Sequence, residues 1–408
     1  MSPRRRWVLF ALVLTAGVLN LVDRQIIAVL KPQISADLGW DDNDYGTLAA
    51  YFQGAAAVAF LFTGWIVDRL GVKWANPIGV VAWSIAAMAH GWARTMAQFI
   101  VCRIALGATE AMGTPAAIKT IAAIFPPATR STGYGISNAT GSVGAILTPL
   151  LIPLVGALWG WRAAFIIAGF LGVVWALAWF ATTRGVDFGD QAKPTPLAAA
   201  APTGTILKER RTWAVAIAKV LSDATWWFLL FWMPDFFNRN FGLSGLDLGP
   251  PLAVAYAGGA IGSLFSGLVA SRLLAQGHSV NKVRKAILLV AALLVLPLPL
   301  ALYVDNYWAA VAMLALVIGA HQAFSTNLFA LIADVTPQAK VGRVTSFGAF
   351  CGNLGGMAIV KIAGLLLVAG YGYQPMFLFA AVSYLLAVGW IQLLLPNIER
   401  YEPSAPIP

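Results

Sequence analysis

Apolar runs of membrane-spanning length recur along the whole chain. A helix that crosses a bilayer needs about 20 predominantly apolar residues, and its backbone polar groups must be hydrogen-bonded within the segment. The pattern therefore predicts an all-α membrane protein with twelve transmembrane helices in two six-helix halves. The expected spans are 7–30, 46–68, 74–93, 97–120, 131–156, 162–182, 212–236, 249–271, 285–304, 307–332, 342–368 and 373–395.

The composition excludes a soluble globular protein. Only 11% of the 408 residues are charged, against roughly 25% in soluble domains, and the mean hydropathy is +0.76. Arg4, Arg5 and Arg6 precede an apolar run that is longer than the core of a signal peptide, so we expect the first span to be retained. Cys102 and Cys351 lie in apolar runs, where we expect buried structural roles.

The net charge of +10 could indicate a nucleic-acid partner, but its distribution favours a membrane protein. Basic residues concentrate in alternate loops, as the positive-inside rule predicts. Asp37, Asp41, Asp42 and Asp44 occupy the first loop with no Lys or Arg between them. We therefore expect a multi-pass protein of the cytoplasmic membrane with both termini in the cytoplasm and no nucleic-acid partner.

A polar linker divides the chain into two similar halves. Residues 1–184 and 212–408 would each form six helices, joined by a cytoplasmic linker at 185–211 that is rich in Ala, Pro and Thr. GWIVDRLGVK in the first half is echoed by GLVASRLLAQGHSVNK in the second, and GSVGA by GNLGG. Parallel six-span repeats are typical of one large class of transporters.

The segment GWIVDRLGVK resembles the loop signature that the major facilitator superfamily carries between its second and third spans. Asp68 and Arg69 would pair with neighbouring helix ends and latch one conformation, while Gly64 and Gly71 would permit a tight crossing. The second copy has Ser271 where the acid would be, so its latch should be weaker.

Ionisable residues inside apolar runs are the strongest functional signal. Each costs on the order of 3 kcal/mol at membrane depth, which predicts a polar cavity or mutual pairing. Three basic and three acidic residues of this kind suit the transport of an acidic solute together with a proton. They are Arg24, Arg103 and the shallower Lys219, and Asp23, Glu110 and Asp223.

Two of the spans carry neighbouring charges on one face. In the first span, Asp23 and Arg24 share a face with Asn20; we expect Arg24 to anchor an anion and Asp23 to be its gating partner, unless the pair only braces the helix. In the fourth span, Arg103 and Glu110 lie two turns apart. Burial disfavours the charged form of Glu110, which suits it to proton coupling, whereas Arg103 is expected in gating or in a structural ion pair with an acid of the first span.

Span 7 and the remaining polar positions offer contacts to a hydroxylated solute. Lys219, Asp223 and Trp226 fall at helical spacing, so Trp226 could form a wall for a sugar ring, although Lys219 could instead snorkel. The other candidate contacts are Tyr51, Asn138, Gln322 and Asn353, which could equally join helices. His321 is either a proton carrier or structural, and Lys119 and Lys361 are expected to snorkel.

Within the superfamily, the chain most resembles the anion:cation symporters, especially bacterial hexuronate transporters. The matching segments are NLVDRQIIAV, RIALGATEAMGTPAAIK, KVLSDATWW and GAHQAFSTNLFALIADV. The resemblance implies that Arg24 and Tyr51 bind the carboxylate and that Asp23 and Glu110 are the proton-linked acids. Lys219 and Asp223 stand where hexuronate transporters have Arg and Glu.

These observations predict a proton-coupled symporter that imports a hexuronate such as glucuronate or galacturonate by alternating access. The alternatives are a symporter of another organic anion (an aldonate or a small carboxylate), an organophosphate exchanger and a drug/proton antiporter. No catalytic or metal-binding motif is evident, so we expect neither an enzyme nor a cofactor. We expect the protein to act as a monomer.

Overall fold

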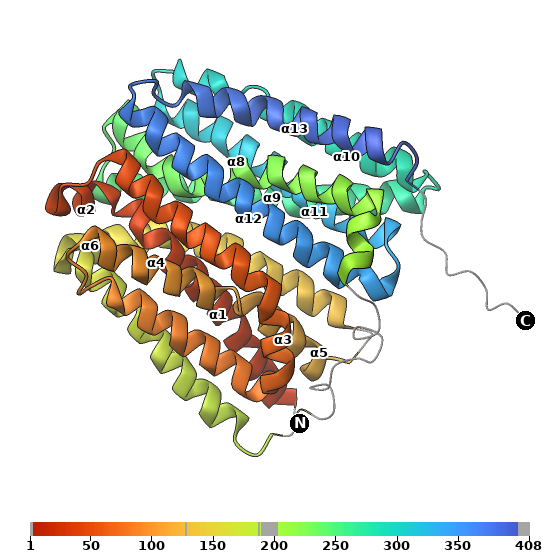
Figure 1. Cartoon of the computed structure of the whole chain (residues 1–408), viewed down its shortest axis with the longest axis horizontal. Helices are drawn as coiled ribbons and strands as arrows, with labels where there is room; N and C mark the ends of the chain where they lie inside the picture. Colours follow the sequence, from red (N-terminus) through yellow and green to blue (C-terminus); the bar gives the residue numbers. More distant parts are fainter. Residues whose placement is uncertain (1–2, 127–128, 187, 189–202, 399–408) are drawn as a thin grey trace, which may run out of the picture. The chain divides into compact units, whose positions relative to one another are not determined.

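The computed structural model describes residues 3–126, 129–186, 188 and 203–398, and within them every regular element is helical (Figure 1). The first half contains α1 (Pro3–Val29), α2 (Lys31–Leu38), α3 (Asp42–Ala89), α4 (Met96–Glu110), α5 (Gly113–Ile124) and α6 (Arg130–Thr183). The second contains η3 (Thr203–Lys208), α8 (Arg210–Phe241), η4 (Gly245–Leu248), α9 (Gly249–Ala275), α10 (Val280–Val295), η5 (Leu298–Leu302), α11 (Tyr307–Val335), α12 (Gln338–Val368) and α13 (Gln374–Leu394).

Nine helices in the described part of the chain are long and apolar enough to cross a membrane. Two of them, α3 and α6, each contain two of the expected spans. Gly71 (φ 68°, ψ 165°) interrupts α3 and Gly160 (φ 79°, ψ 162°) interrupts α6, and a positive φ of this kind favours glycine. The interrupted pair α4 and α5 accounts for the remaining expected span. The predicted all-α membrane fold is therefore confirmed.

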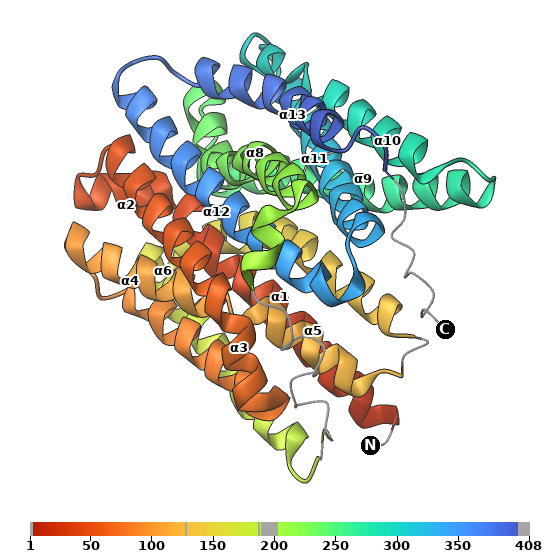
Figure 2. The ribbon, with the colours of Figure 1, turned by 45° about the vertical axis from the view of Figure 1, so that its right-hand side comes forward.

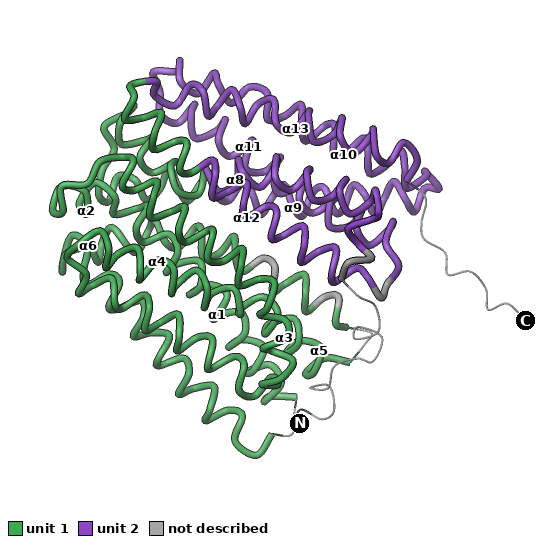
Figure 3. The backbone as a smooth tube through the Cα atoms, in the orientation of Figure 1, with its two compact units in different colours: residues 1–194, 229–254, 360–370 green, residues 195–228, 255–359, 371–408 purple. Residues whose placement is uncertain are grey.

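The chain forms two compact units that do not simply follow its two halves (Figure 3). Unit 1 comprises residues 1–194, 229–254 and 360–370, and unit 2 comprises residues 195–228, 255–359 and 371–408. The division into halves at 1–184 and 212–408 stays a prediction. Residues 187 and 189–202 of the predicted linker lie outside the described residues.

Close backbone approaches hold the helices of unit 1 together. The main packing is of α3 against α4 and α6, and of α1 against α6. A Cβ on Gly107 of α4 would lie 2.3 Å from the carbonyl oxygen of Phe52 on α3, and one on Gly172 of α6 would lie 1.9 Å from Oγ of Ser84 on α3. Small residues at such crossings let membrane helices pack closely.

Unit 2 uses the same device on other helices. Its α10 packs against α11 and α13 (Figure 2). Gly258 and Gly262 of α9 meet the backbone of Ala315 and Gly319 on α11, where added Cβ atoms would come within 2.2 Å and 2.0 Å of carbonyl oxygens. These crossings fix the register of the helices that carry the polar side chains described below.

The GWIVDRLGVK segment behaves only partly as predicted. Gly71 forms the turn between two spans, as its positive φ shows. Gly64 has open space where a side chain would lie, so its predicted role at a tight crossing is wrong.

Candidate functional site

A buried ion pair joins α1 to α4 in unit 1. Nε and Nη2 of Arg24 donate to Oε2 of Glu110 at 3.1 and 2.9 Å, and Nη2 also donates to Oδ1 of Asn20 at 3.3 Å. The Glu110 side chain is fully buried, whereas that of Arg24 is 15% exposed. Arg24 therefore pairs with Glu110 rather than with Asp23, because adjacent side chains on a helix point apart.

Asp23 and Arg103 are buried close to this pair without hydrogen bonds of their own. Neither carboxylate oxygen of Asp23 and none of the three guanidinium nitrogens of Arg103 has a hydrogen-bond partner, although the two residues are 1% and 0% exposed. The charges of Asp23, Arg103 and Glu110 act on one another. The predicted alternative of a structural ion pair between Arg103 and an acid of the first span is wrong.

Phe52 completes this cluster, and its neighbour Tyr51 lies apart from it. The guanidinium carbons of Arg24 and Arg103 lie over the Phe52 ring, 5.1 and 5.8 Å from its centroid. Phe52 is fully buried, but Tyr51 is 46% exposed and has no hydrogen bond to Arg24 in the described structure. The assignment of Tyr51 to a substrate carboxylate stays a prediction. We call Asp23, Arg24, Phe52, Arg103 and Glu110 the Arg24 cluster.

A second buried ion pair lies on one helix of unit 2. Nζ of Lys219 is 2.8 Å from Oδ2 of Asp223, one turn along α8, and it also lies 4.7 Å from the centroid of the Phe329 ring. The two side chains are 6% and 14% exposed. The alternative that Lys219 snorkels is wrong. Asp223 is paired as the sequence allowed, and its gating role stays a prediction.

An aromatic stack adjoins this pair. The ring of Trp226 is stacked on that of His321, with centroids 5.2 Å apart and planes 8° apart. Nδ1 of His321 lies 2.7 Å from the Tyr384 hydroxyl, which donates to the carbonyl of Ser222 at 3.1 Å. One face of Trp226 is therefore covered by His321, and the contact of Trp226 with a solute ring stays a prediction.

Of three other predicted contacts, two have neighbours of their own within the protein and the third cannot be placed. Asn353 is 6% exposed, and its Nδ2 donates to the carbonyl of Ala349 on its own helix. Gln322 packs against α9, where a Cβ on Gly259 would lie 3.2 Å from Cγ of Gln322. The side chain of Asn138 lies outside the described residues. All three contacts with a solute stay predictions.

Of the two charged residues of the loop signature, Asp68 pairs with a neighbouring helix and Arg69 does not, and their role as a latch stays a prediction. Asp68 accepts from Lys119 of α5 at 2.5 Å, so Lys119 has an ion-pair partner near the end of its span. Arg69 instead lies over the ring of Trp65, 4.8 Å from its centroid. Lys361, which was also expected to snorkel, donates to Thr47 Oγ1 at 2.5 Å and to the side chain of Asn43.

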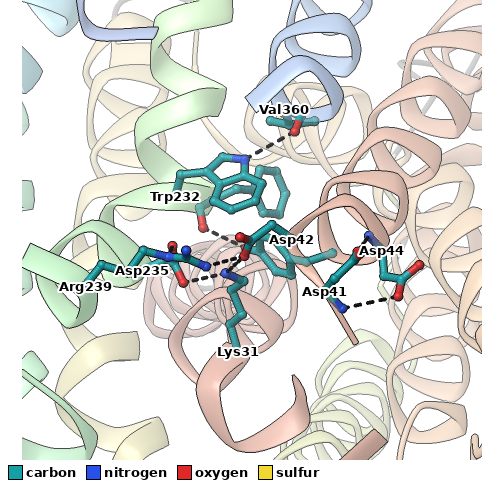
Figure 4. A network of polar contacts seen from close by, with 10 residues as sticks. Lys31, Asp41, Asp42, Asp44, Trp232, Asp235, Arg239 and Val360 are labelled. Carbon is teal, nitrogen blue, oxygen red and sulfur yellow. Dashed lines mark hydrogen bonds and ion pairs between the residues drawn. The ribbon is translucent and has the colours of Figure 1, made fainter. Parts of the chain in front are cut away.

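Sequence reasoning missed a polar cluster at the far end of α1 in unit 1 (Figure 4). Lys31 pairs with Asp42 at 2.6 Å and with Asp235, and Arg239 pairs with Asp235 at 2.6 Å and with Asp42. Lys31 also lies 4.8 Å from the centroid of the Trp232 ring. The signal available in the sequence was Asp235 at the end of an apolar run, one helical turn before Arg239.

No metal site is evident in the part of the chain that the structure describes: no three His, Cys, Asp or Glu side chains gather there to hold an ion. The Arg24 cluster combines two guanidinium groups with two carboxylates, and one of its cations is reachable.

Comparisons with known proteins find relatives that are named as transporters of sugar acids. The chain is 26% identical to a D-galactonate transporter of Escherichia coli over 95% of its own length and 96% of the relative's. It is 27% identical to the hexuronate transporter of Escherichia coli K12, covering 97% of this chain and 95% of that one. A probable galactarate/D-glucarate transporter of Bacillus subtilis is 22% identical, over 99% and 96%.

Solved structures and the family assignment agree on the fold. A bacterial homologue of the human lysosomal transporter Spinster superposes with a TM-score of 0.80 at 19% identity, covering 99% of this chain and 100% of that one. A D-xylose-proton symporter superposes with a TM-score of 0.74 at 13% identity, covering 96% and 98%. Residues 13–360 and 273–406 match the sequence model of the family described as Major Facilitator Superfamily. The chain is a multi-pass membrane transport protein, not an enzyme, and it belongs to the Major Facilitator Superfamily.

Proposed function

We propose that the protein is a proton-coupled symporter that imports a sugar acid, such as a hexuronate, across the cytoplasmic membrane by alternating access. The Arg24 cluster is the observation that carries the proposal. Arg24 offers a planar, forked guanidinium, which suits a carboxylate, and its 15% exposed side chain is the reachable cation of the cluster. The protein would act as a monomer with both termini in the cytoplasm.

The charge balance of the cluster supports proton coupling. The charges of two guanidinium groups and two ionised carboxylates sum to zero. An entering anion would leave one negative charge uncompensated in a buried region, which is costly. Uptake of one proton by Glu110 or Asp23 would restore neutrality, and protonation of Glu110 would release its ion-pair partner Arg24 to the solute. Loading with both anion and proton therefore gives the carrier a form that can reorient.

Transport in proteoliposomes tests the proposal. Hexuronate uptake should rise with an inward proton gradient and collapse when a protonophore is added. Aldonates belong in the same assay, because a D-galactonate transporter is among the similar proteins. Uptake that needs sodium and resists the protonophore would refute the proton coupling, and no uptake of any sugar acid would refute the substrate class.

Glu110→Gln separates exchange of the anion from its proton-driven accumulation. Glutamine resembles the protonated acid and cannot release a proton, so exchange of internal for external anion should persist while accumulation against a gradient is lost. The matched control is Glu209→Gln, which removes a carboxylate of unit 2 that ion-pairs with Arg211 and Lys340. A Glu110→Gln protein that still concentrates the anion would remove Glu110 from the coupling.

A further inference from the structure

Phe52 is fully buried, and two positive charges share its ring. The guanidinium carbons of Arg24 and Arg103 lie 5.1 and 5.8 Å from the ring centroid. A cation within about 6 Å over an aromatic face is attracted by the ring quadrupole, more strongly where water is excluded. The ring therefore lets two like charges occupy one small buried region.

The packing of α3 on α4 sets this position. Gly107 lies between Arg103 and Glu110 on one stripe of α4, four residues after the first and three before the second. A Cβ there would come within 2.3 Å of the Phe52 carbonyl oxygen. Because Gly107 has no side chain, the backbone of α3 at Phe52 rests on α4 midway between the two charged residues.

Arg103 depends on this ring more than Arg24 does. Arg24 has hydrogen bonds to Glu110 and Asn20, whereas all three guanidinium nitrogens of Arg103 lack a partner. A buried charge without hydrogen bonds is costly, so a released Arg103 would turn to a carboxylate. Both oxygens of Asp23 and Oε1 of Glu110 are buried without partners and would accept it.

We propose that Phe52 is a positioning residue for anion recognition. Its ring holds the charge of Arg103 beside the Arg24–Glu110 pair, so that an entering carboxylate meets the field of two guanidinium groups. The ring also keeps Arg103 from pairing with Asp23 or Glu110. The role of Phe52 in anion recognition rests on the proposed function, but the contact between the Phe52 ring and Arg103 does not.

A double-mutant cycle tests the contact and the role separately. Wild type, Phe52→Leu, Arg103→Gln and the double variant are compared by thermal unfolding without solute, and by calorimetric binding of D-glucuronate and D-galactonate. Phe52→Leu should weaken anion binding by roughly 3- to 30-fold. In the Arg103→Gln background the same change should weaken binding by a smaller factor, because only the contact of the ring with Arg24 remains to be lost.

Two further variants separate positioning from packing. Phe52→Tyr keeps the aromatic face and should restore most of the affinity. Phe165→Leu removes another fully buried ring of unit 1, and no guanidinium lies over that ring in the described residues. It should lower thermal stability and leave affinity unchanged.

Equal losses of affinity in both Arg103 backgrounds, or a Phe52→Leu protein that binds like Phe165→Leu, would overturn the inference. If the wild type binds neither acid, the proposed function fails, and the solute-free cycle still decides the contact. If the effects of Phe52→Leu and Arg103→Gln on thermal unfolding add up, the contact between the two residues is overturned. If the effects are not additive, the contact is upheld.

Discussion

The ion pairs Arg24–Glu110 of unit 1 and Lys219–Asp223 of unit 2 are both buried, but they are built differently. The first joins α1 to α4 and leaves Asp23 and Arg103 beside it without hydrogen bonds. The second closes within one turn of α8. A pair within one helix survives any movement of that helix, whereas a pair between helices depends on their relative position. We infer that only the first pair is suited to exchanging its partner during transport.

Arg24→Ala tests this contrast with the largest expected effect. A charge-assisted contact screened from water contributes about 1.5–3 kcal/mol, so anion affinity should fall by roughly 10- to 150-fold. Arg24→Lys should restore it only partly, because an ammonium lacks the planar fork. Calorimetric binding to monodisperse protein is the measurement. Near wild-type affinity in a folded Arg24→Ala protein would remove Arg24 from the site and make Lys219 the leading candidate.

Alanine substitutions at glycines near the two ion pairs test how rigid the packing is around each pair. A Cβ on Gly107 would lie 2.3 Å from a backbone oxygen of α3, whereas one on Gly352 of α12 would lie 2.2 Å from Oδ2 of Asp223, the end of a side chain. The backbone cannot yield, so Gly107→Ala should destabilise the fold by about 1–3 kcal/mol. Gly352→Ala should cost less, because Asp223 can rotate away from Lys219.

Thermal unfolding of both alanine variants measures this difference. Gly348→Ala is the matched control on α12, because its Cβ would meet side-chain atoms no closer than the flexible Cδ of Lys219, at 3.1 Å, and Cγ1 of Val215, at 3.3 Å. The expected order of destabilisation is Gly107, then Gly352, then Gly348. A Gly352→Ala protein less stable than Gly107→Ala would show that the Lys219–Asp223 pair is the more rigid of the two.

The sequence predicts the helices of this protein far better than their contacts. Bilayer thickness sets the length of every apolar run, so the spans could be read directly. Arg24 could be recognised as a candidate site residue because a charge in an apolar run is costly. Its partner could not, because Asp23 is adjacent in sequence while Glu110 is 86 residues away, and the choice between them depends on how α1 packs against α4.

The same limit explains the contacts that sequence reasoning missed. Lys31 lies near the end of a predicted span and looked unremarkable, yet it pairs with Asp235, 204 residues further along the chain. Lys119 was expected to extend toward the membrane surface, and its ion pair with Asp68, 51 residues earlier, could not be read from the sequence. The pattern of apolar residues indicates which side chains are unusual, but only tertiary packing brings their partners together.

The smallest effect on stability is expected at Glu209. Like Glu110, Glu209 pairs with a residue of a helix from another part of the chain, but its ion pairs are within reach of water. Its side chain is 17% exposed and pairs with Arg211 and Lys340 at 2.5 Å each. Burial alone would raise the pKa of Glu209, but hydrogen bonds from Lys340 and Arg211 outweigh it and hold the pKa below its ordinary value.

A lowered pKa stabilises the fold at pH values above the ordinary pKa of about 4.3, and this stabilisation is lost as the pH falls through the folded-state pKa. Glu209→Gln should therefore lower stability at pH 7 by under about 1 kcal/mol, and thermal unfolding curves of variant and wild type should converge on acidification below pH ~4. A difference that stays constant down to pH ~3 would show that the carboxylate acts through packing rather than through its charge.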